Sequence, residues 1–252
     1  MAQEIRLYTT QPLKENADIF FDGGQAHYLS IVMRCKAGDK LSLFNGIDGQ
    51  WQAEITHVGK KTVTAAAISQ TRPQISSPDL WLIFAPIKNK TEIVVEKATE
   101  LGVCKIIPIV TRHCVVRSVN IEKLSTHAVE AAEQCERLDI PTIETYKDLS
   151  YLLGDWKTDR ILLYGDETGG GVSLQKILQN ADKNAKYAVL IGPEGGFTAD
   201  ELEMLGVCEF AKPFGMGARI LRADTAAIAA LACVQANSDD WEAKPHFLTP
   251  IS

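Results

Sequence analysis

The chain has 252 residues, of which 46% are hydrophobic and 23% charged, the composition of an ordinary globular protein. No apolar run approaches the roughly 20 residues of a membrane-spanning helix, and the amino terminus lacks the pattern of a signal peptide, so we expect a cytoplasmic protein. The six cysteines show no CxxC spacing, so neither a zinc site nor a disulfide framework is indicated. A net charge of -6 argues mildly against a nucleic-acid partner, although one basic face can outweigh the chain total.

The first 72 residues have the pattern of a small β-barrel. Short stretches rich in β-formers alternate with turn signals, as in a sheet of many short strands. One segment, residues 25–34, instead predicts a helix, whose apolar face consists of Tyr28, Leu29, Val32 and Met33. The expected strands are residues 5–9, 19–21, 40–44, 51–57 and 62–68.

A linker follows the expected barrel. Prolines and serines in the stretches 71–73 and 76–78 interrupt both strand and helix periodicity. We therefore expect a β-barrel at residues 1–72, a linker at 73–79 and a second domain at 80–252.

The second domain alternates apolar runs with amphipathic segments, which is typical of an α/β fold. A helix is expected to begin at Thr198, and Asp224 or Thr225 is expected to cap the last helix. The other expected helices are residues 91–101, 121–138 and 225–237. The expected strands are residues 80–84, 106–110, 160–164, 187–191 and 209–213.

A glycine-rich loop, GPEGG at residues 192–196, follows the buried strand at 187–191. Thr198 and Glu201 have the spacing of a capping box, so a helix begins directly after the loop. Ligands of α/β proteins commonly bind at such a junction. Three interpretations stay open: a tight turn without a ligand, a phosphate cradle, and a loop that wraps a small cofactor. The phosphate cradle is the weakest, because no Lys-Ser/Thr follows the glycines as a P-loop requires.

Three motifs together resemble the carboxyl-terminal signature of SPOUT-class methyltransferases. They are GPEGG at 192–196, KPFG at 212–215 and GARILRADTA at 217–226. Within that class the chain is most similar to the family that methylates N3 of a uridine in the decoding region of 16S ribosomal RNA.

Other segments of the chain match the same family, so the resemblance covers nearly the whole sequence. KATELGV at 97–103 and the run at 133–141 resemble family motifs, and HYLSIVMR at 27–34 resembles part of its amino-terminal barrel. One departure is Asp224, where the family usually has Glu.

The resemblance implies an α/β fold with a carboxyl-terminal, trefoil-knotted SPOUT methyltransferase domain and a small amino-terminal PUA-like β-barrel that binds RNA. It implies S-adenosylmethionine as cofactor and no metal. The implied partner is 16S ribosomal RNA within the small ribosomal subunit, and the implied assembly is a homodimer with the Ala-rich last helix at its interface.

The resemblance also implies site residues. Arg222 is the first catalytic candidate, because its fixed donors could stabilise a uridine anion; the alternative is a salt bridge to Glu194 or Asp224. Glu194 could act as a base or hold the loop. The expected cofactor contacts, chiefly through the main chain, are Leu163, Tyr164, Gly165, Gly192, Pro193, Glu194, Gly195, Gly196, Phe214, Gly215, Ile220 and Leu221.

The expected RNA contacts are basic residues, and any one of them could instead be ordinary surface charge. For Arg34, phosphate binding and capping of its own helix remain equal alternatives. The candidates are Arg6, His27, Arg34, Lys88, Lys90, Arg112, Arg117 and Arg137.

Two other functions remain open. The chain could methylate another RNA position with the same fold and cofactor, or it could be an RNA-binding dimer without catalysis. The intact glycine loops argue against the second, because a protein that binds no cofactor has no physical need for them.

Overall fold

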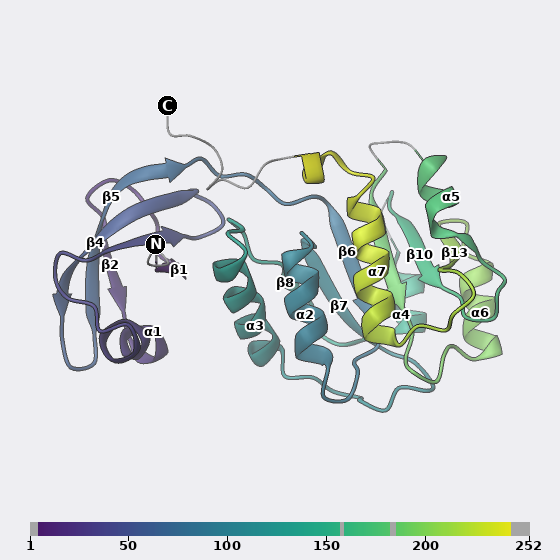
Figure 1. Ribbon diagram of the computed structural model, residues 1–252. Helices are drawn as coiled ribbons and strands as arrows, with labels where there is room; N and C mark the ends of the chain where they lie inside the picture. The colour runs from purple at the N-terminus through teal and green to yellow at the C-terminus, as the bar shows by residue number, and fades with distance from the viewer. Residues whose placement is uncertain (1–4, 157–158, 182–184, 243–252) are drawn as a thin grey trace. The chain divides into compact units, whose positions relative to one another are not determined.

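The computed structural model describes residues 5–156, 159–181 and 185–242 (Figure 1). The chain divides into two compact units. Unit 1 consists of Met1–Ser76 and Ala132–Ile140, and unit 2 consists of Ser77–Ala131 and Pro141–Ser252. Unit 1 therefore includes a segment, Ala132–Ile140, that the sequence pattern placed in the second domain.

Unit 1 is built on a mixed five-stranded sheet with the order β1-β3-β4-β5-β2. β1 runs parallel to β3, and the other neighbouring pairs are antiparallel. Ile19, Leu43 and Ile55 are buried in one cluster, which forms the core of the unit. The strands are β1 Arg6–Tyr8, β2 Asp18–Phe21, β3 Lys40–Phe44, β4 Gln50–Val58 and β5 Val63–Arg72.

The expected helix of unit 1 consists of two short segments. α1 spans Gly23–His27 and continues into η1, a π-helical turn over Tyr28–Val32. A π-turn holds more residues than an α-turn, so it rotates the following side chains away from the face that α-helical spacing predicts. Leu29 is buried as expected. The other members of the predicted apolar face are exposed, namely Tyr28, Val32 and Met33.

Arg6 of β1 joins the two chain segments of unit 1 at the end of α3 (Ile121–Gln134). Its Nη1 donates to the carbonyl of Ala132 at 2.7 Å, and its Nη2 donates to the carbonyl of Arg137 at 2.5 Å. Its Nε donates to Gln50 Oε1 at 3.0 Å. The guanidinium therefore satisfies carbonyls at the carboxyl end of a helix, where cations are stabilised.

These contacts make Arg6 and Arg137 poor candidates for RNA binding. Burial, followed by the nearby charge of Arg72, lowers the pKa of Arg6 to about 10. The side chain of Arg137 is 7% exposed, and its Nε lies 2.6 Å from Asp139 Oδ1. The Arg6 guanidinium links two segments of unit 1, and that of Arg137 binds a neighbouring carboxylate, so both are engaged within the protein.

Unit 2 contains a parallel sheet with the order β11-β13-β10-β12-β6-β7-β8, and β9 pairs with β7 beside it. β6 and β12 match their predicted bounds. The two-residue strands were not predicted, because so short a run carries no periodicity. The strands are β6 Leu80–Phe84, β7 Lys105–Val110, β8 Thr142–Ile143, β9 Lys147–Asp148, β10 Ile161–Gly165, β11 Val172–Ser173, β12 Tyr187–Ile191 and β13 Ala211–Gly215.

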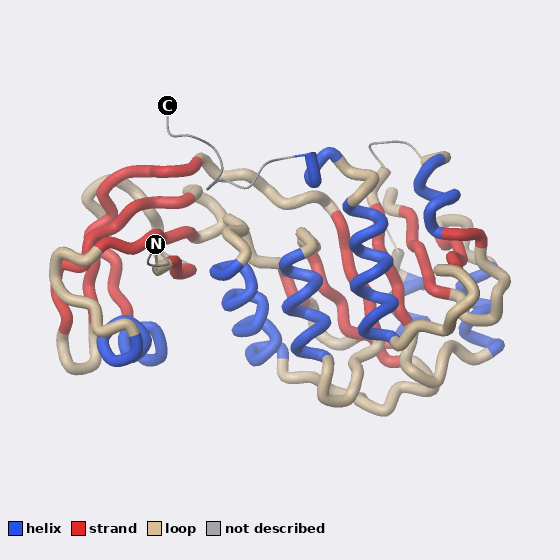
Figure 2. The backbone as a smooth tube through the Cα atoms, in the orientation of Figure 1, coloured by secondary structure: helices blue, strands red, loops and turns tan. Residues whose placement is uncertain are grey.

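Helices lie on both faces of this sheet (Figure 2). Ala188 and Leu190 of β12 belong to a core cluster with residues of α4 and α6, while α7 packs on β12 and β6 and lies beside α2. The chain that leaves β13 thus passes β10 and places α7 on the two strands at the middle of the sheet, β12 and β6. The helices are α2 Thr91–Glu100, α4 Leu149–Gly154, α5 Leu174–Gln179, α6 Ala199–Gly206, α7 Ala223–Gln235 and η2 Asp239–Glu242.

Within the described residues, no helix is long and apolar enough to cross a membrane. The same part of the chain contains no group of three or more His, Cys, Asp or Glu side chains arranged to hold a metal ion.

Replacing Arg6 by Met should destabilise unit 1 by about 2 kcal/mol, because it leaves carbonyls at the end of α3 without their charged donor. Native-state hydrogen exchange of the β1 and β3 amides measures this loss. Lys14→Met is the control, since Lys14 is an exposed cation of the same unit. Equal protection in both variants would contradict the structural role of Arg6.

Candidate functional site

Three loops of unit 2 leave the parallel sheet at the same edge. In the register of the sheet, Tyr164 of β10 lies opposite Leu190 of β12. Gly165, at the end of β10, lies opposite Phe214 of β13. Because the three strands are parallel neighbours, their carboxyl ends bring together the loops at 166–171, 192–198 and 216–222. These loops carry most of the expected cofactor residues.

The GPEGG loop is held between a buried strand and a capped helix. Every residue of β12 is buried. The Gly196 N–H donates to the Pro193 carbonyl at 2.9 Å, and Gly196 has φ 69°, which closes a tight turn that favours glycine. Thr198 and Glu201 form the predicted capping box at the start of α6. The sequence thus specifies both ends of the loop locally.

Side chains from two other loops lie against the glycines. A Cβ at Gly196 would lie 1.8 Å from Glu167 Oε1, in the loop after β10. A Cβ at Gly195 would lie 3.1 Å from the Cβ of His113, in the loop after β7. Neither Glu167 nor His113 was an expected site residue. Each follows the end of a strand by two or three positions, and this was the signal that could have found them.

The expected cofactor residues differ in how much they expose. The side chains of Leu163, Tyr164 and Phe214 are buried, so chiefly their main-chain groups would meet a ligand. Ile220, in the loop after β13, is 87% exposed, and Leu221 is half-buried. This loop therefore offers apolar side chains beside the glycine loop, as an aromatic or adenosyl ligand requires.

Arg222 is an exposed cation at the same edge of the sheet. It is the N-cap residue of α7, but its side chain makes no capping hydrogen bond. Among the residues that the structure describes, no ion pair or hydrogen bond involves its guanidinium. The salt bridge to Glu194 or Asp224 that was the alternative role is thus absent from this part of the chain. Glu194 is exposed as well.

Asp224 lies in the first turn of α7 and binds Lys90. The prediction that Asp224 or Thr225 caps this helix is wrong, because the helix already begins at Ala223. Lys90 Nζ lies 2.5 Å from Asp224 Oδ2, and this hydrogen bond is the main cause of a lowered Asp224 pKa. The ammonium of Lys90 is therefore occupied within the protein and is a poor candidate for RNA contact.

The remaining expected RNA contacts are exposed. In unit 2 these are Lys88, Arg112 and Arg117, and in unit 1 they are His27 and Arg34. None of the five forms an ion pair with another described residue. Their charges are thus available to a ligand, as RNA binding requires.

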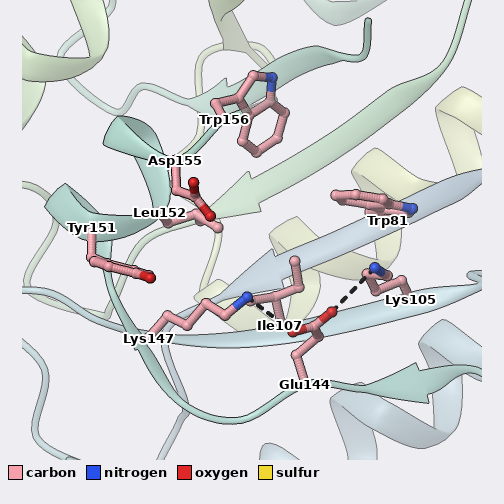
Figure 3. Close-up of a pocket in the computed structure, with 9 residues that line it drawn as sticks. All are labelled: Trp81, Lys105, Ile107, Glu144, Lys147, Tyr151, Leu152, Asp155 and Trp156. Atoms are coloured by element: carbon pink, nitrogen blue, oxygen red, sulfur yellow. Dashed lines mark hydrogen bonds and ion pairs between the residues drawn. The ribbon is translucent and has the colours of Figure 1, made fainter. Parts of the chain in front are cut away.

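A cavity of about 200 Å³ lies at the opposite end of the unit 2 sheet (Figure 3). Its walls include Trp81 near the start of β6, Lys105 at the start of β7, and Trp156. Glu144 lies 3.1 Å from the Lys105 ammonium and 2.9 Å from that of Lys147, and these lysines lower its pKa. Lys105, Glu144 and Lys147 of this cavity are thus paired with one another, and the cavity lies away from the glycine loops. We therefore do not take it as the candidate site.

Comparison with protein families agrees with this arrangement. Residues 75–235 match the model of an RNA methyltransferase domain, and residues 21–68 match that of an RNA methyltransferase PUA domain. A ribosomal RNA small subunit methyltransferase E from Rickettsia conorii is 38% identical over 232 residues, which cover 91% of this chain and 94% of that protein. The chain belongs to the ribosomal RNA small subunit methyltransferase E family.

Solved structures of this methyltransferase family have the same fold. A Legionella pneumophila protein, described as a putative methyltransferase in complex with S-adenosylmethionine, is 28% identical with a TM-score of 0.81, covering 94% of this chain and 99% of its own. Ribosomal RNA small subunit methyltransferase E from Neisseria gonorrhoeae is 22% identical with a TM-score of 0.83, covering 94% and 98%. The predicted fold class, a SPOUT methyltransferase domain with a PUA-like amino-terminal domain, is confirmed.

The Lys90–Asp224 pair should make the stability of this methyltransferase depend on pH in the acid range. Because the folded state lowers the Asp224 pKa, the stabilisation is present above the ordinary aspartate pKa and is lost as the pH falls through the lowered value. A double-mutant cycle of Lys90→Met and Asp224→Asn, followed by thermal unfolding, should give a coupling at about pH 7 that disappears near pH 2. Equal coupling at both pH values would contradict the ion pair.

Proposed function

We propose that this chain methylates N3 of a uridine in 16S ribosomal RNA, using S-adenosylmethionine as methyl donor. The observation that carries the proposal is the meeting of three loops at the carboxyl edge of β10, β12 and β13. In the glycine loop the missing Cβ atoms let Phe197, His113 and Glu167 pack directly on the backbone, which fixes the shape of the loop. Membership of the methyltransferase family and the cofactor in the Legionella relative support it.

The proposed cofactor site uses main-chain groups for polar contacts and a few apolar side chains as walls. Ile220 and Leu221 suit the adenine ring, and the main-chain groups of Gly165 and Gly192 are proposed to supply polar contacts. When bound, S-adenosylmethionine supplies an activated methyl group on its sulfonium. No metal is needed for that chemistry.

The proposed role of the protein's own side chains is to make N3 of uridine nucleophilic. N3 carries a proton at neutral pH, so its removal must be assisted or the resulting anion stabilised. Arg222 can do the second, because its guanidinium is exposed and makes no ion pair with a described residue. Glu194 is the second catalytic candidate, since its carboxylate is exposed in the glycine loop.

The proposed substrate is an unpaired or flipped-out uridine, because a stacked base could not reach a methyl group within these loops. His27 and Arg34 of unit 1, with Lys88, Arg112 and Arg117 of unit 2, are proposed to bind phosphates. We further propose that the protein acts in the cytoplasm on the small ribosomal subunit, as a homodimer formed through α7.

Isothermal titration with S-adenosylmethionine tests the cofactor site. Wild-type protein should bind at micromolar strength, and Gly195→Leu should bind at least about tenfold more weakly, because the new side chain meets His113 and fills the loop surface. Gly206→Leu is the matched control, since a Cβ there meets nothing within 4 Å.

Two outcomes would redirect the proposal. Protein that binds no S-adenosylmethionine, alone or with small ribosomal subunits, would favour the RNA-binding dimer without catalysis. Methylation mapped to another base or position would keep the cofactor and change the acceptor.

Arg222→Ala should lower kcat by about 10²- to 10³-fold, the usual loss when one preorganised donor to a developing anion is removed. The affinity for S-adenosylmethionine should stay within about twofold. Arg222→Lys keeps the charge without the planar fork and should recover only part of the rate. A large loss of cofactor affinity in Arg222→Ala would instead assign Arg222 to the cofactor site.

A further inference from the structure

His113 reaches the glycine loop from a different part of the chain. It is an exposed residue of the loop after β7, and its Nδ1 lies 2.9 Å from the carbonyl oxygen of Gly195 and 3.1 Å from that of Gly196. These are the two glycines that close the GPEGG loop before α6. One ring nitrogen thus contacts the carbonyl oxygens of two consecutive residues in the proposed cofactor site.

The identity of the acceptors fixes the protonation of this ring. A carbonyl oxygen can only accept, so His113 Nδ1 must carry the hydrogen in both contacts. In the neutral ring Nδ1 carries the hydrogen and Nε2 has the lone pair. In the charged ring both nitrogens carry a hydrogen. The contacts to Gly195 and Gly196 therefore persist in either charge state.

The loop that carries His113 is hydrogen-bonded to α6, the helix that follows the glycine loop. The neighbouring Arg112 donates its backbone N–H to Glu201 Oε1 at 2.8 Å, and Glu201 is the 5% exposed carboxylate of the capping box of α6. Thr111 and Cys114, on either side of the pair, are buried. Two adjacent residues of one loop thus hold both the glycine turn and the start of α6.

We propose that His113 is a positioning residue for the cofactor loop, holding the Gly195–Gly196 carbonyls so that the loop keeps the shape that receives S-adenosylmethionine. The inference rests on the proposed function. Glycines have the greatest backbone freedom of any residue, so an unanchored loop would have to be ordered when the ligand binds. The Nδ1–H anchor orders it beforehand.

Two substitutions separate the hydrogen bond from the bulk of the ring. His113→Leu keeps an apolar side chain of similar reach but has no donor, and His113→Asn is smaller but places an amide N–H near the position of Nδ1. We expect His113→Leu to weaken S-adenosylmethionine binding about tenfold. His113→Asn should bind within about threefold of wild type. Val115→Ala, a 75% exposed position in the same loop, should bind as wild type does.

Nitrogen-15 NMR of the histidine rings tests the hydrogen bond itself, independently of ligand binding. The His113 signal, assigned by its loss in His113→Leu, should show a protonated Nδ1 and an unprotonated Nε2 near pH 8, opposite to the tautomer that free histidine prefers. Protonation at Nε2 alone would overturn the anchor.

The binding data distinguish the remaining outcomes. Wild-type affinity in His113→Leu, or no recovery in His113→Asn, would overturn the positioning role and leave the proposed function standing. If the wild-type protein binds no S-adenosylmethionine, either alone or with small ribosomal subunits, the proposed function and the cofactor role of His113 are overturned together, and the NMR signal then reports only on the anchor.

Discussion

The parallel pairing of β10, β12 and β13 is the constraint on which the rest of unit 2 depends. Parallel strands cannot be joined by tight hairpins, so each strand must be followed by a crossover that begins at the same edge of the sheet. Three loops separated along the chain are thereby gathered at one place, and none could form the site alone. All five residues of β12 are buried and the strand pairs with both β10 and β6, so it lies inside the sheet with both faces covered.

Local chemistry explains which features were predictable from sequence. The apolar run at Tyr187–Ile191 and the capping box of Thr198 and Glu201 depend on residues close together in the chain, and both were found with the correct bounds. The contact of His113 with Gly195 joins residues 82 positions apart, and no periodicity encodes it. The two-residue strands and the six-residue helices α4 and α5 were also not predicted from the sequence. Elements this short are determined more by tertiary packing than by local propensity.

Charge was the least reliable guide to role. Arg6, Arg137 and Lys90 were grouped with the surface cations, yet each donates to a carbonyl or carboxylate of its own unit. Arg222 was the first catalytic candidate, with a salt bridge to Glu194 or Asp224 as the alternative, and no such salt bridge is found among the described residues. Which cations remain available depends on where the chain brings its acids and helix ends, and the net charge of -6 says nothing about that.

The division of unit 1 between two chain segments has a consequence during synthesis. Phe44 of β3 packs against Ala132 and Leu138, and Arg6 of β1 needs the carbonyls of the same segment. The main core of the amino-terminal strands lies within the first segment, but the cluster around Phe44 cannot form until the chain has been translated through Leu138. The first 76 residues alone would leave this apolar cluster open to solvent. The amino-terminal unit is thus completed during synthesis only after the first part of the next unit has been translated.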